Sequence, residues 1–290
     1  MKNAGFFAKL EAASRQNSSL LCVGLDHDPE RMALSDVAAF NRAIIEATAD
    51  LVCAYKPNLG FYEALGEAGM AALRDTLAAV PPPIPTIGDA KRGDVGHTAR
   101  AYAQALFDGW GFDAVTVNPY LGGDALAPFL EREDRGVFVL CRTSNPGAAE
   151  LQDLMVVGKG EEAASAARPL FEAVAERARA WNSHGNVGLV VGATYPQELA
   201  RVRELCPEMT FLVPGVGAQG GDLEASLRCG LDARGAGLII NVSRQVLYAS
   251  RERDFAQAAR RAAQALRDQI NRERDRAVDR RETPPARPGS

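Results

Sequence analysis

The sequence has few of the features that mark membrane or secreted proteins. It contains no run of about 18 apolar residues, the length that a membrane-spanning helix requires. The N-terminal segment MKNAGFFAKLEAASRQ is amphipathic and lacks the apolar centre of a signal peptide. The five cysteines are widely spaced and form no Cys-x-x-Cys pair, which predicts small buried thiols in a reducing compartment. We therefore expect a soluble cytoplasmic protein.

Histidine and net positive charge are scarce as well. The three histidines, His27, His97 and His184, do not have the spacing of metal ligands. The net charge is −4, whereas proteins that bind nucleic acid or a membrane surface usually have a basic face. The sequence therefore predicts no metal site, no nucleic-acid partner and no membrane partner, although a local basic site for one phosphate group is compatible with it.

Eight short apolar runs recur along the chain, separated by segments with helical periodicity. The runs are continuously apolar, as in parallel strands that are buried on both faces. Eight strands, each followed by a helix, predict one closed (β/α)8 TIM barrel of the α/β class. The competing fold, a doubly wound open sheet, often has a Gly-x-Gly-x-x-Gly turn after its first strand, and this chain has none. The predicted strands are Leu20–Leu25, Leu51–Lys56, Ile84–Asp89, Ala114–Asn118, Val137–Cys141, Gly188–Gly192, Thr210–Pro214 and Gly237–Asn241.

Segments outside the eight repeats complete the predicted organisation. An extra helix near Phe6–Arg15 could cover the bottom of the barrel, and Arg142–Lys159 is expected to form an enlarged loop after the fifth strand. The end of the chain mixes charges with prolines, which is typical of disorder. We expect the barrel domain to fill residues 1–272 and a disordered tail to fill residues 273–290. The predicted helices of the barrel include Val37–Asp50, Phe61–Val80, His97–Trp110, Glu161–Asn182 and Gln197–Glu204.

Charged residues follow the first three predicted strands. In this fold the active site lies at the C-terminal ends of the strands, and these ends carry Asp26, Lys56 and Asp89, with Lys91 and Asp94 just beyond. Unpaired charges would be costly at the mouth of a barrel. The alternation of acid and base around the mouth therefore indicates a paired network.

Asp89 and Lys91 give the sharpest chemical signal in this network. They lie two residues apart at a strand end, so their side chains leave the same face. The neighbouring carboxylate keeps Lys91 protonated, because an opposite charge favours the charged form. A fixed ammonium in a barrel mouth can donate a proton and can stabilise a developing carbanion. The same spacing would also suit an ordinary ion pair at a strand end.

A glycine-rich loop and an arginine follow the last two predicted strands. The loop Pro214–Gly221 lets backbone N–H groups approach an anion. Arg244 lies at the start of a short predicted helix, where it could contact a phosphate with two N–H groups. Phosphate sites after strands seven and eight are common in this barrel. The pattern predicts a phosphate site, and a surface loop without a ligand is the alternative.

The run Asp89-Ala90-Lys91-Arg92-Gly93-Asp94 resembles the Asp-x-Lys-x-x-Asp signature of the orotidine 5′-phosphate decarboxylases. Four further segments agree with that family in order and spacing, and the resemblance extends from about Leu20 to Tyr248. The long loop after the fifth strand and the Lys56-Pro57-Asn58 run are similar to the longer, type 2 bacterial branch. The four segments are Val23–Asp26, Tyr55–Asn58, Val213–Gly221 and Val242–Arg244.

The resemblance implies a cofactor-independent enzyme that converts orotidine 5′-monophosphate (OMP) to UMP and CO2, the final step of UMP biosynthesis. Lys91 would protonate C6 of the pyrimidine, and Asp89 would lie near the substrate carboxylate. Lys56 would bridge Asp89 and the ribose. Asp94 and Thr98 would reach into the site of a partner subunit, which implies a homodimer with composite active sites.

The resemblance also implies contacts with the rest of the substrate. Asp26 would bind the ribose hydroxyls, and Gln219 would connect the phosphate and the base. Ser144, or alternatively Thr143, would bind the pyrimidine amide. The implied substrate-binding residues are Asp26, Thr98, Ser144, Pro214, Gln219, Ser243 and Arg244.

Other functions on a related barrel are less consistent with these residues. The Mg2+-dependent sugar-phosphate decarboxylases and aldolases of this superfamily resemble one another in having an acidic residue at the end of strand two. This chain has Lys56 there, which would repel the metal. A non-catalytic phosphate-binding barrel would be expected to lack part of the network, which is complete here. Schiff-base chemistry needs a lysine that loses its proton in an apolar pocket, and the aspartates around Lys91 favour the opposite.

Overall fold

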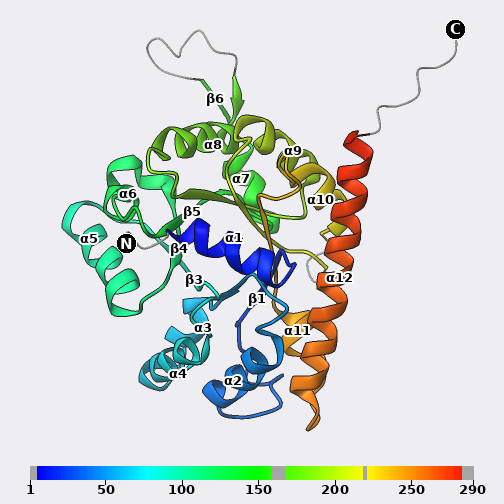
Figure 1. The fold of residues 1–290 in the computed structure, drawn as a ribbon. Helices are drawn as coiled ribbons and strands as arrows, with labels where there is room; N and C mark the ends of the chain where they lie inside the picture. Colours follow the sequence, from blue (N-terminus) through cyan, green and yellow to red (C-terminus); the bar gives the residue numbers. More distant parts are fainter. Residues whose placement is uncertain (1–4, 158–166, 218–220, 283–290) are drawn as a thin grey trace, which may run out of the picture.

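Eight parallel strands form the centre of the molecule and close into a barrel (Figure 1). The computed structural model describes residues 5–157, 167–217 and 221–282. The strands are β1 (Leu21–Gly24), β2 (Ala54–Lys56), β3 (Ile87–Arg92), β4 (Ala114–Val117), β5 (Gly136–Arg142), β8 (Val187–Val191), β9 (Phe211–Pro214) and β10 (Leu238–Val242). They are hydrogen-bonded in the order β2-β1-β10-β9-β8-β5-β4-β3, and bridges from Tyr55 to Thr86 and from Asn58 to Asp89 connect β2 with β3. The predicted (β/α)8 barrel is confirmed.

Helices cover the outside of the barrel (Figure 1). They are α2 (Val37–Thr48), α3 (Leu59–Glu63), α4 (Gly66–Ala79), α5 (Gly96–Gln104) with a π-helical turn η1 (Ala105–Gly109), α6 (Gly123–Leu130), α8 (Leu170–Trp181), α9 (Pro196–Leu205), α10 (Leu223–Gly230), α11 (Arg244–Leu247) and α12 (Phe255–Glu282). The turns η2 (Pro119–Leu121) and η3 (Pro146–Ala148) are 3-10 helices. After η3 come α7 (Ala149–Gln152) and the antiparallel strands β6 (Met155–Val156) and β7 (Arg168–Pro169).

Two predicted helices differ from those observed. Residues 61–80 form parts of two helices, because Gly66, the first residue of α4, adopts a left-handed φ of 60°. In the segment 161–182, helix α8 begins only at Leu170, because the two residues before it pair with β6. Residues 161–166 lie outside the described residues.

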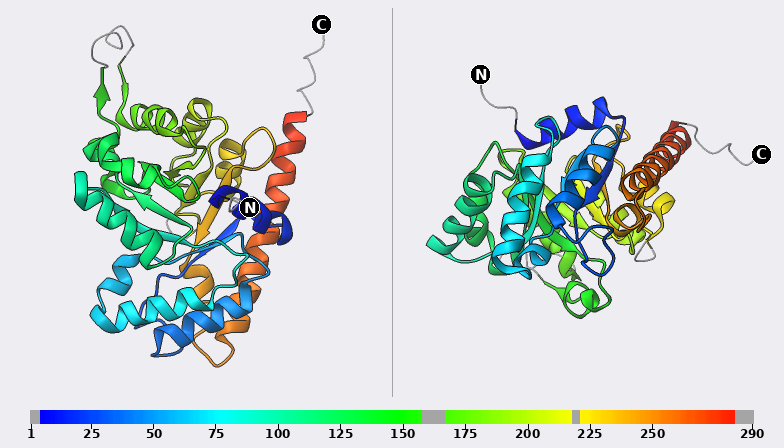
Figure 2. Two further views of the ribbon diagram at one scale, coloured as in Figure 1. Left: turned by 60° about the vertical axis from the view of Figure 1, so that its left-hand side comes forward. Right: turned by 90° about the horizontal axis from the view of Figure 1, so that it is seen from below.

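The end of the barrel domain also differs from the prediction. Helix α12 packs against α2 and α10 along one side of the barrel (Figures 1 and 2) and continues through Glu282. Its apolar face includes Ile270 and Ala277, which are 0% and 6% exposed. Burial of this face carries the helix past residue 272, so the prediction that disorder begins at residue 273 is wrong. Residues 283–290 lie outside the described residues.

Two apolar clusters form the core. The larger one lies between the strands and the surrounding helices, whereas the smaller one fills the barrel. Helix α1 (Phe6–Gln16) crosses the N-terminal end of the barrel in Figure 1, and the ring of Phe6 meets that of Phe138 edge-on at 5.7 Å between centroids. The predicted N-terminal helix that covers the bottom is therefore confirmed. The smaller cluster comprises Phe6, Leu10, Cys22, Cys53, Ala54, Ile87, Ala114, Phe138, Val190, Leu212 and Ile239.

The barrel interior changes from apolar to polar towards the C-terminal ends of three strands. Side chains alternate along a strand, so residues two apart share a face. An apolar residue is followed two positions later by a polar one, in the pairs Ala54 and Lys56, Ile87 and Asp89, and Ala114 and Thr116. This alternation places a polar layer above the apolar cluster, where its side chains meet.

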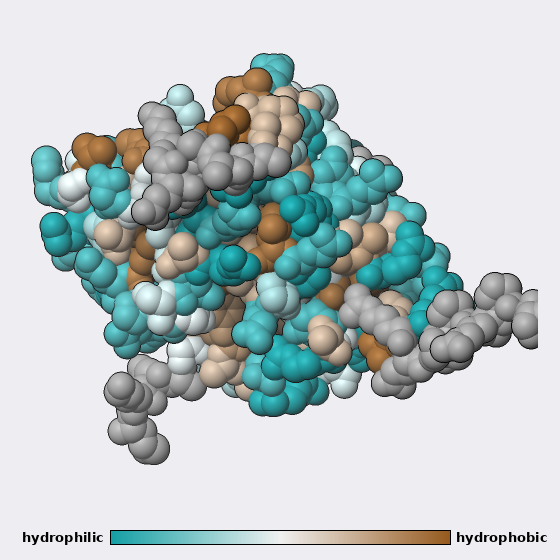
Figure 3. Space-filling model, turned by 90° about the horizontal axis from the view of Figure 1, so that it is seen from above, coloured by the Kyte–Doolittle hydropathy of each residue, from teal (hydrophilic) through white to brown (hydrophobic). Residues whose placement is uncertain are grey.

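Among the described residues, no helix combines the length and apolar composition needed to cross a bilayer. The face in Figure 3 is largely hydrophilic and carries several separate hydrophobic areas.

Candidate active site

Asp89 is the centre of a charged network at the mouth of the barrel. Its Oδ2 lies 2.8 Å from Lys56 Nζ, and its Oδ1 lies 2.5 Å from Lys91 Nζ. The side chains of Lys56 and Asp89 are 4% and 11% exposed, whereas that of Lys91 is 47% exposed. The network thus has a buried part, Lys56 and Asp89, and an accessible ammonium at the mouth. These three predicted residues are brought together within one chain.

Both buried members of this network are charged at neutral pH. Burial alone would raise the pKa of the Asp89 carboxyl, but the ammonium groups of Lys56 and Lys91 outweigh burial and hold that pKa well below its usual range. Burial likewise opposes the charge of Lys56, but the carboxylates of Asp89 and Asp26 raise its pKa above the usual value. Each charge is stable in this site because the other is present.

Lys91 has an unusual backbone conformation. Its φ is +49°, in the left-handed region that L-residues avoid, at a cost of roughly 1–2 kcal/mol. The pairing of β3 with β4 shifts register between Gly88 and Arg92, on either side of Lys91. Such outliers cluster at functional sites, where the surrounding structure holds them in place. Here the conformation accompanies the contact between the Lys91 ammonium and Asp89.

Asp26 follows β1 and is held by residues that follow β10. Ser243 Oγ donates to Asp26 Oδ2 at 2.6 Å, and the Tyr248 hydroxyl donates to the Asp26 backbone carbonyl at 2.9 Å. A side chain at Gly24 would collide with Ser243, since a Cβ there would lie 2.1 Å from its Oγ. Asp26 Oδ1 is buried and has no hydrogen-bond partner among the described residues. It is therefore suited to accept a hydrogen bond from a hydroxyl of a ligand.

The loop after β5 contains both predicted contacts for the pyrimidine amide, Ser144 and Thr143. The Thr143 hydroxyl donates to Asn145 Oδ1 at 2.6 Å and accepts from Gln152 Nε2 at 2.8 Å, so it is used within the loop. Ser144 packs against Gly192, just beyond β8, where a Cβ would come within 2.8 Å of Ser144 Cβ. Both residues thus lie at the C-terminal ends of β5 and β8, where either could meet a ligand.

Arg142 anchors the same loop, a role that sequence reasoning missed. Its side chain is only 1% exposed, and the guanidinium lies 4.0 Å from the centre of the Tyr195 ring. It donates to Gln152 Oε1 at 3.3 Å and to Asp153 Oδ2 at 3.2 Å. The signal in the sequence was a charged residue at the end of an apolar strand.

The predicted phosphate-binding residues come from neighbouring strand ends. β9 ends at Pro214, and Gly215 and Gly217 adopt φ values of 94° and 70°, which favour glycine. A Cβ at Gly217 would lie 3.2 Å from the side-chain oxygen of Gln245, so this loop lies beside α11. Arg244 begins α11 and is exposed. Gln219 lies outside the described residues.

Asp94 and Thr98 lie apart from the network within this chain. Asp94 Oδ1 accepts the backbone N–H of Val95 at 2.7 Å, and none of the ion pairs found in the described part of the chain joins Asp94 to Lys91. Thr98 lies in the first turn of α5. Exposed apolar side chains surround this region, which we name the α5 surface: Val95, Tyr102, Tyr120 and Leu121.

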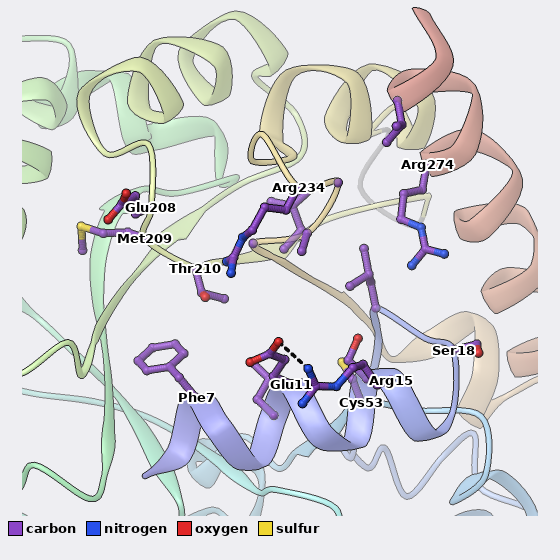
Figure 4. Close-up of a pocket in the computed structure, with 18 of the residues that line it drawn as sticks. Phe7, Glu11, Arg15, Ser18, Cys53, Glu208, Met209, Thr210, Arg234 and Arg274 are labelled. Atoms are coloured by element: carbon purple, nitrogen blue, oxygen red, sulfur yellow. Dashed lines mark hydrogen bonds and ion pairs between the residues drawn. The ribbon is translucent and has the colours of Figure 1, made fainter. Parts of the chain in front are cut away.

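A cavity of about 910 Å3 lies at the opposite end of the barrel, between α1, the beginnings of the strands and α12 (Figure 4). It is also lined by charged residues, and two of its arginines pair with acids close to them in sequence. Arg15 Nη1 lies 2.8 Å from Glu11 Oε1, and Arg234 Nη2 lies 3.1 Å from Asp232 Oδ2. The side chains of Arg15 and Arg234 are 72% and 75% exposed. Arg15 and Arg234 thus pair with separate acids, whereas Lys56 and Lys91 share Asp89, so the mouth remains the candidate active site.

Comparison with known proteins shows the family to which this chain belongs. The sequence model of the orotidine 5′-phosphate decarboxylase / HUMPS family matches residues 19–262, which include every candidate site residue. The chain belongs to this family. An orotidine 5′-phosphate decarboxylase of Thermomicrobium roseum is 56% identical over 274 residues, which cover 92% of this chain and 95% of the relative.

Solved structures of the decarboxylase family are similar over nearly the whole chain. The Leishmania donovani OMP decarboxylase has a TM-score of 0.81 and 46% identity, covering 93% of this chain and 99% of that one. The Leishmania donovani UMP synthase has a TM-score of 0.83 and 47% identity, again over 93% of this chain but over only 57% of that longer protein. The decarboxylase family relation therefore covers the barrel and its mouth together.

Proposed function

We propose that this chain is an orotidine 5′-monophosphate decarboxylase that forms UMP and CO2 without a cofactor. The observation that carries the proposal is the buried Lys56–Asp89 pair with the accessible Lys91 ammonium 2.5 Å from the same carboxylate, in a member of this family. Related proteins that are 50–56% identical over more than nine-tenths of the chain bear the name of this enzyme.

Lys91 would carry the chemical step. When the bond between C6 and the carboxylate breaks, CO2 leaves and the electron pair stays on C6. The ammonium of Lys91 would stabilise this developing carbanion and transfer its proton to C6, after which water would restore the proton on nitrogen. Catalysis requires that Lys91 interacts more strongly with the transition state than with OMP. The fixed position of its ammonium beside Asp89 supports this role.

Asp89, Lys56 and Asp26 would arrange the reacting groups. Asp89 would face the carboxylate of the substrate, and Lys56 would keep Asp89 ionised while reaching the ribose. The unpartnered Oδ1 of Asp26 would accept a hydrogen bond from a ribose hydroxyl. The short Ser243–Asp26 hydrogen bond supports a fixed orientation for this carboxylate.

The far end of the substrate would be held by the β5 loop and by residues after β9 and β10. Ser144 would bind the pyrimidine amide, and Arg244 would contact the phosphate together with the backbone after Pro214. Gln219 would connect the two groups. Binding energy from the phosphate can fix the reacting ring and so increase the rate as well as the affinity.

We further propose a homodimer with composite sites, in which Asp94 and Thr98 of each subunit reach the site of the other. The α5 surface supports this arrangement. Val95, Tyr120 and Leu121 are 55%, 83% and 44% exposed, and Asp94 lies beside Val95. Large exposed apolar side chains in such numbers are compatible with a protein–protein interface.

Mixing two inactive variants tests the composite site. Dimers of Lys91→Ala and dimers of Asp94→Ala are each expected to be nearly inactive. In a mixed dimer one site carries both substitutions and the other site is intact. An equal mixture after subunit exchange should therefore recover about a quarter of wild-type activity, since half the dimers are mixed. No recovery in demonstrated mixed dimers would contradict the composite site.

Product analysis tests the activity itself. Purified wild type in EDTA is expected to convert OMP to equal amounts of UMP and CO2, measured by chromatography and by CO2 release. A folded protein that leaves OMP unchanged would contradict the proposed function. Activity with sugar phosphates only when Mg2+ is added would identify a metal-dependent relative instead.

A further inference from the structure

Thr116 of β4 connects the two catalytic side chains of β3 through a single oxygen atom. Its hydroxyl donates to Asp89 Oδ1 at 3.0 Å, and the same oxygen accepts the backbone N–H of Lys91 at 3.0 Å. Thr116 is 1% exposed, so no bulk water competes for these bonds. We propose that Thr116 is a positioning residue that fixes the Asp89 carboxylate and the Lys91 ammonium relative to each other. This role rests on the proposed decarboxylase function.

The backbone of Lys91 needs this hydroxyl. The left-handed φ of Lys91 interrupts the ladder between β3 and β4, which pairs Gly88 with Val115 and resumes only when Arg92 pairs with Val117. The Lys91 N–H therefore bonds to a side chain of β4 rather than to its backbone. A backbone N–H without a partner would be costly at this position. Thr116 thus helps to stabilise the left-handed backbone conformation of Lys91, which sets the direction of the Lys91 side chain.

The hydroxyl also has a defined direction. Thr116 has only one O–H proton, and because its oxygen already accepts the Lys91 N–H, that proton points to Asp89 Oδ1. Oδ1 is the oxygen that Lys91 Nζ contacts at 2.5 Å, whereas Lys56 holds Oδ2 at 2.8 Å. Three donors thus fix the rotation of the carboxylate. Without Thr116, only the two lysines would define it.

Loss of the hydroxyl should affect the chemical step and not substrate binding. A small misplacement of a reacting group can cost up to about 100-fold in rate. Thr116→Val keeps the β-branched shape and removes only the hydroxyl. We expect this variant to lower kcat by about 10- to 100-fold and to leave KM and the Kd for UMP within about twofold of wild type. Thr116→Ser retains the hydroxyl and should keep kcat within about threefold.

A buried threonine elsewhere provides the matched control. Thr48, at the end of α2, is 0% exposed, and its hydroxyl donates to the Ile44 carbonyl and bonds to the Tyr55 hydroxyl. Thr48→Val also removes a buried hydroxyl with two hydrogen bonds, but Thr48 belongs to a helix on the outside of the barrel. It should lower the melting temperature without changing kcat. Thr116→Ala serves as a second hydroxyl-free variant if Thr116→Val does not fold.

The experiment measures kcat, KM, the Kd for UMP and the crystal structure of each variant. A loss of kcat restored by serine, with the Lys91 backbone or the Asp89 carboxylate displaced in the valine or alanine variant, would support the positioning role. Unchanged kcat in a folded variant without the hydroxyl, a loss confined to KM, or a serine variant as slow as valine would overturn it. If wild type does not turn over OMP, the proposed function fails. The crystal structures would then still test whether Thr116 fixes the Asp89 carboxylate relative to the Lys91 ammonium. An unchanged Lys91–Asp89 pair in the variants without the hydroxyl would overturn that claim.

Discussion

The two ends of the barrel each contain a lysine–aspartate pair, but the pairs differ in their surroundings. At the bottom, Lys9 of α1 lies 2.9 Å from Asp113, and their side chains are 28% and 21% exposed. At the mouth, Lys56 lies 2.8 Å from Asp89, with side-chain exposures of 4% and 11%, and Lys91 contacts the same carboxylate. The distances are nearly equal, so distance does not distinguish a structural ion pair from a catalytic one.

The two lysine–aspartate pairs differ in how deeply they are buried and in how many cations contact the carboxylate. In the mouth, two cations share one buried anion, so the charges depend on one another and a substrate meets a preformed electrostatic field. In the bottom cavity, Arg15 pairs with Glu11 (Figure 4), and Arg234 pairs with Asp232, which is close to it in sequence; each acid is contacted by a largely exposed arginine. An exposed pair such as Arg15–Glu11 contributes about 0–1 kcal/mol to stability and needs no functional explanation. The comparison predicts that substitutions at the mouth reduce activity, whereas substitutions at the bottom leave activity unchanged even where they reduce stability.

The largest expected effect comes from Asp89→Asn. A neutral amide cannot balance Lys56 and Lys91, and it also loses one of the acceptor oxygens. We expect kcat/KM for OMP to fall by about 1000-fold or more, and the free energy of unfolding to fall by about 3–5 kcal/mol because Lys56 loses its buried partner. Steady-state kinetics and urea unfolding check both.

Asp113→Asn is the matched control at the bottom, since it removes the same charge from the pair with Lys9. It should leave kcat/KM within about twofold of wild type. If Asp113→Asn reduced activity as strongly as Asp89→Asn, the distinction between the two ends would be lost.

A smaller loss is expected for Arg244→Ala, which removes the proposed phosphate contact while the Asp89 network stays intact. Truncating a charged contact with a buried anionic ligand costs about 2–5 kcal/mol, so kcat/KM should fall by about 30- to 4000-fold. Arg234→Ala, in the bottom cavity, is the arginine control and should have no kinetic effect. Near-wild-type kcat/KM in Arg244→Ala would reject its role at the phosphate.

Phe6→Ala should separate the two properties, with a loss of stability and no loss of catalysis. Phe6 is 2% exposed and closes the bottom of the barrel against Phe138. Its truncation is expected to lower the free energy of unfolding by about 3–5 kcal/mol. At a temperature where the variant is fully folded, kcat and KM should match those of wild type. A selective loss of kcat in the folded variant would show that the two ends are coupled.

The smallest predicted effect concerns pH. Burial lowers the pKa of His27, although the nearby Asp26 opposes this. Because the unfolded chain then binds a proton more readily than the folded one, stability falls as the pH decreases through about 6.5. Urea unfolding between about pH 7.5 and 5.5 should show this slope in wild type and a smaller slope in His27→Phe. Equal slopes would exclude His27 as the titrating group.

Sequence reasoning predicted the parts of this molecule that follow from periodicity and charge. The eight apolar runs correspond to the eight strands, and the Asp89–Lys91 spacing correctly places both side chains on one face. Element ends were less accurate, because they depend on tertiary contacts. The break at Gly66 and the continuation of α12 past residue 272 are examples.

The positioning residues could not be recognised in the same way. Thr116 lies in an apolar run, where a threonine is an ordinary strand residue. Only the register of β3 against β4 shows that its hydroxyl meets Asp89 and Lys91. Arg142 gave a visible signal, but its partners Gln152 and Asp153 belong to a loop whose path the sequence does not define.

The central claim is that the accessible cation of the mouth, Lys91, performs the chemistry. The most direct test is the decrease in ultraviolet absorbance as OMP is converted to UMP in EDTA, for wild type and Lys91→Ala at matched concentrations of folded protein. The account predicts turnover by wild type and a loss of at least about 1000-fold in kcat for Lys91→Ala, while the variant still binds UMP. Substantial turnover by the variant would contradict the account and would move the proton donor to another group.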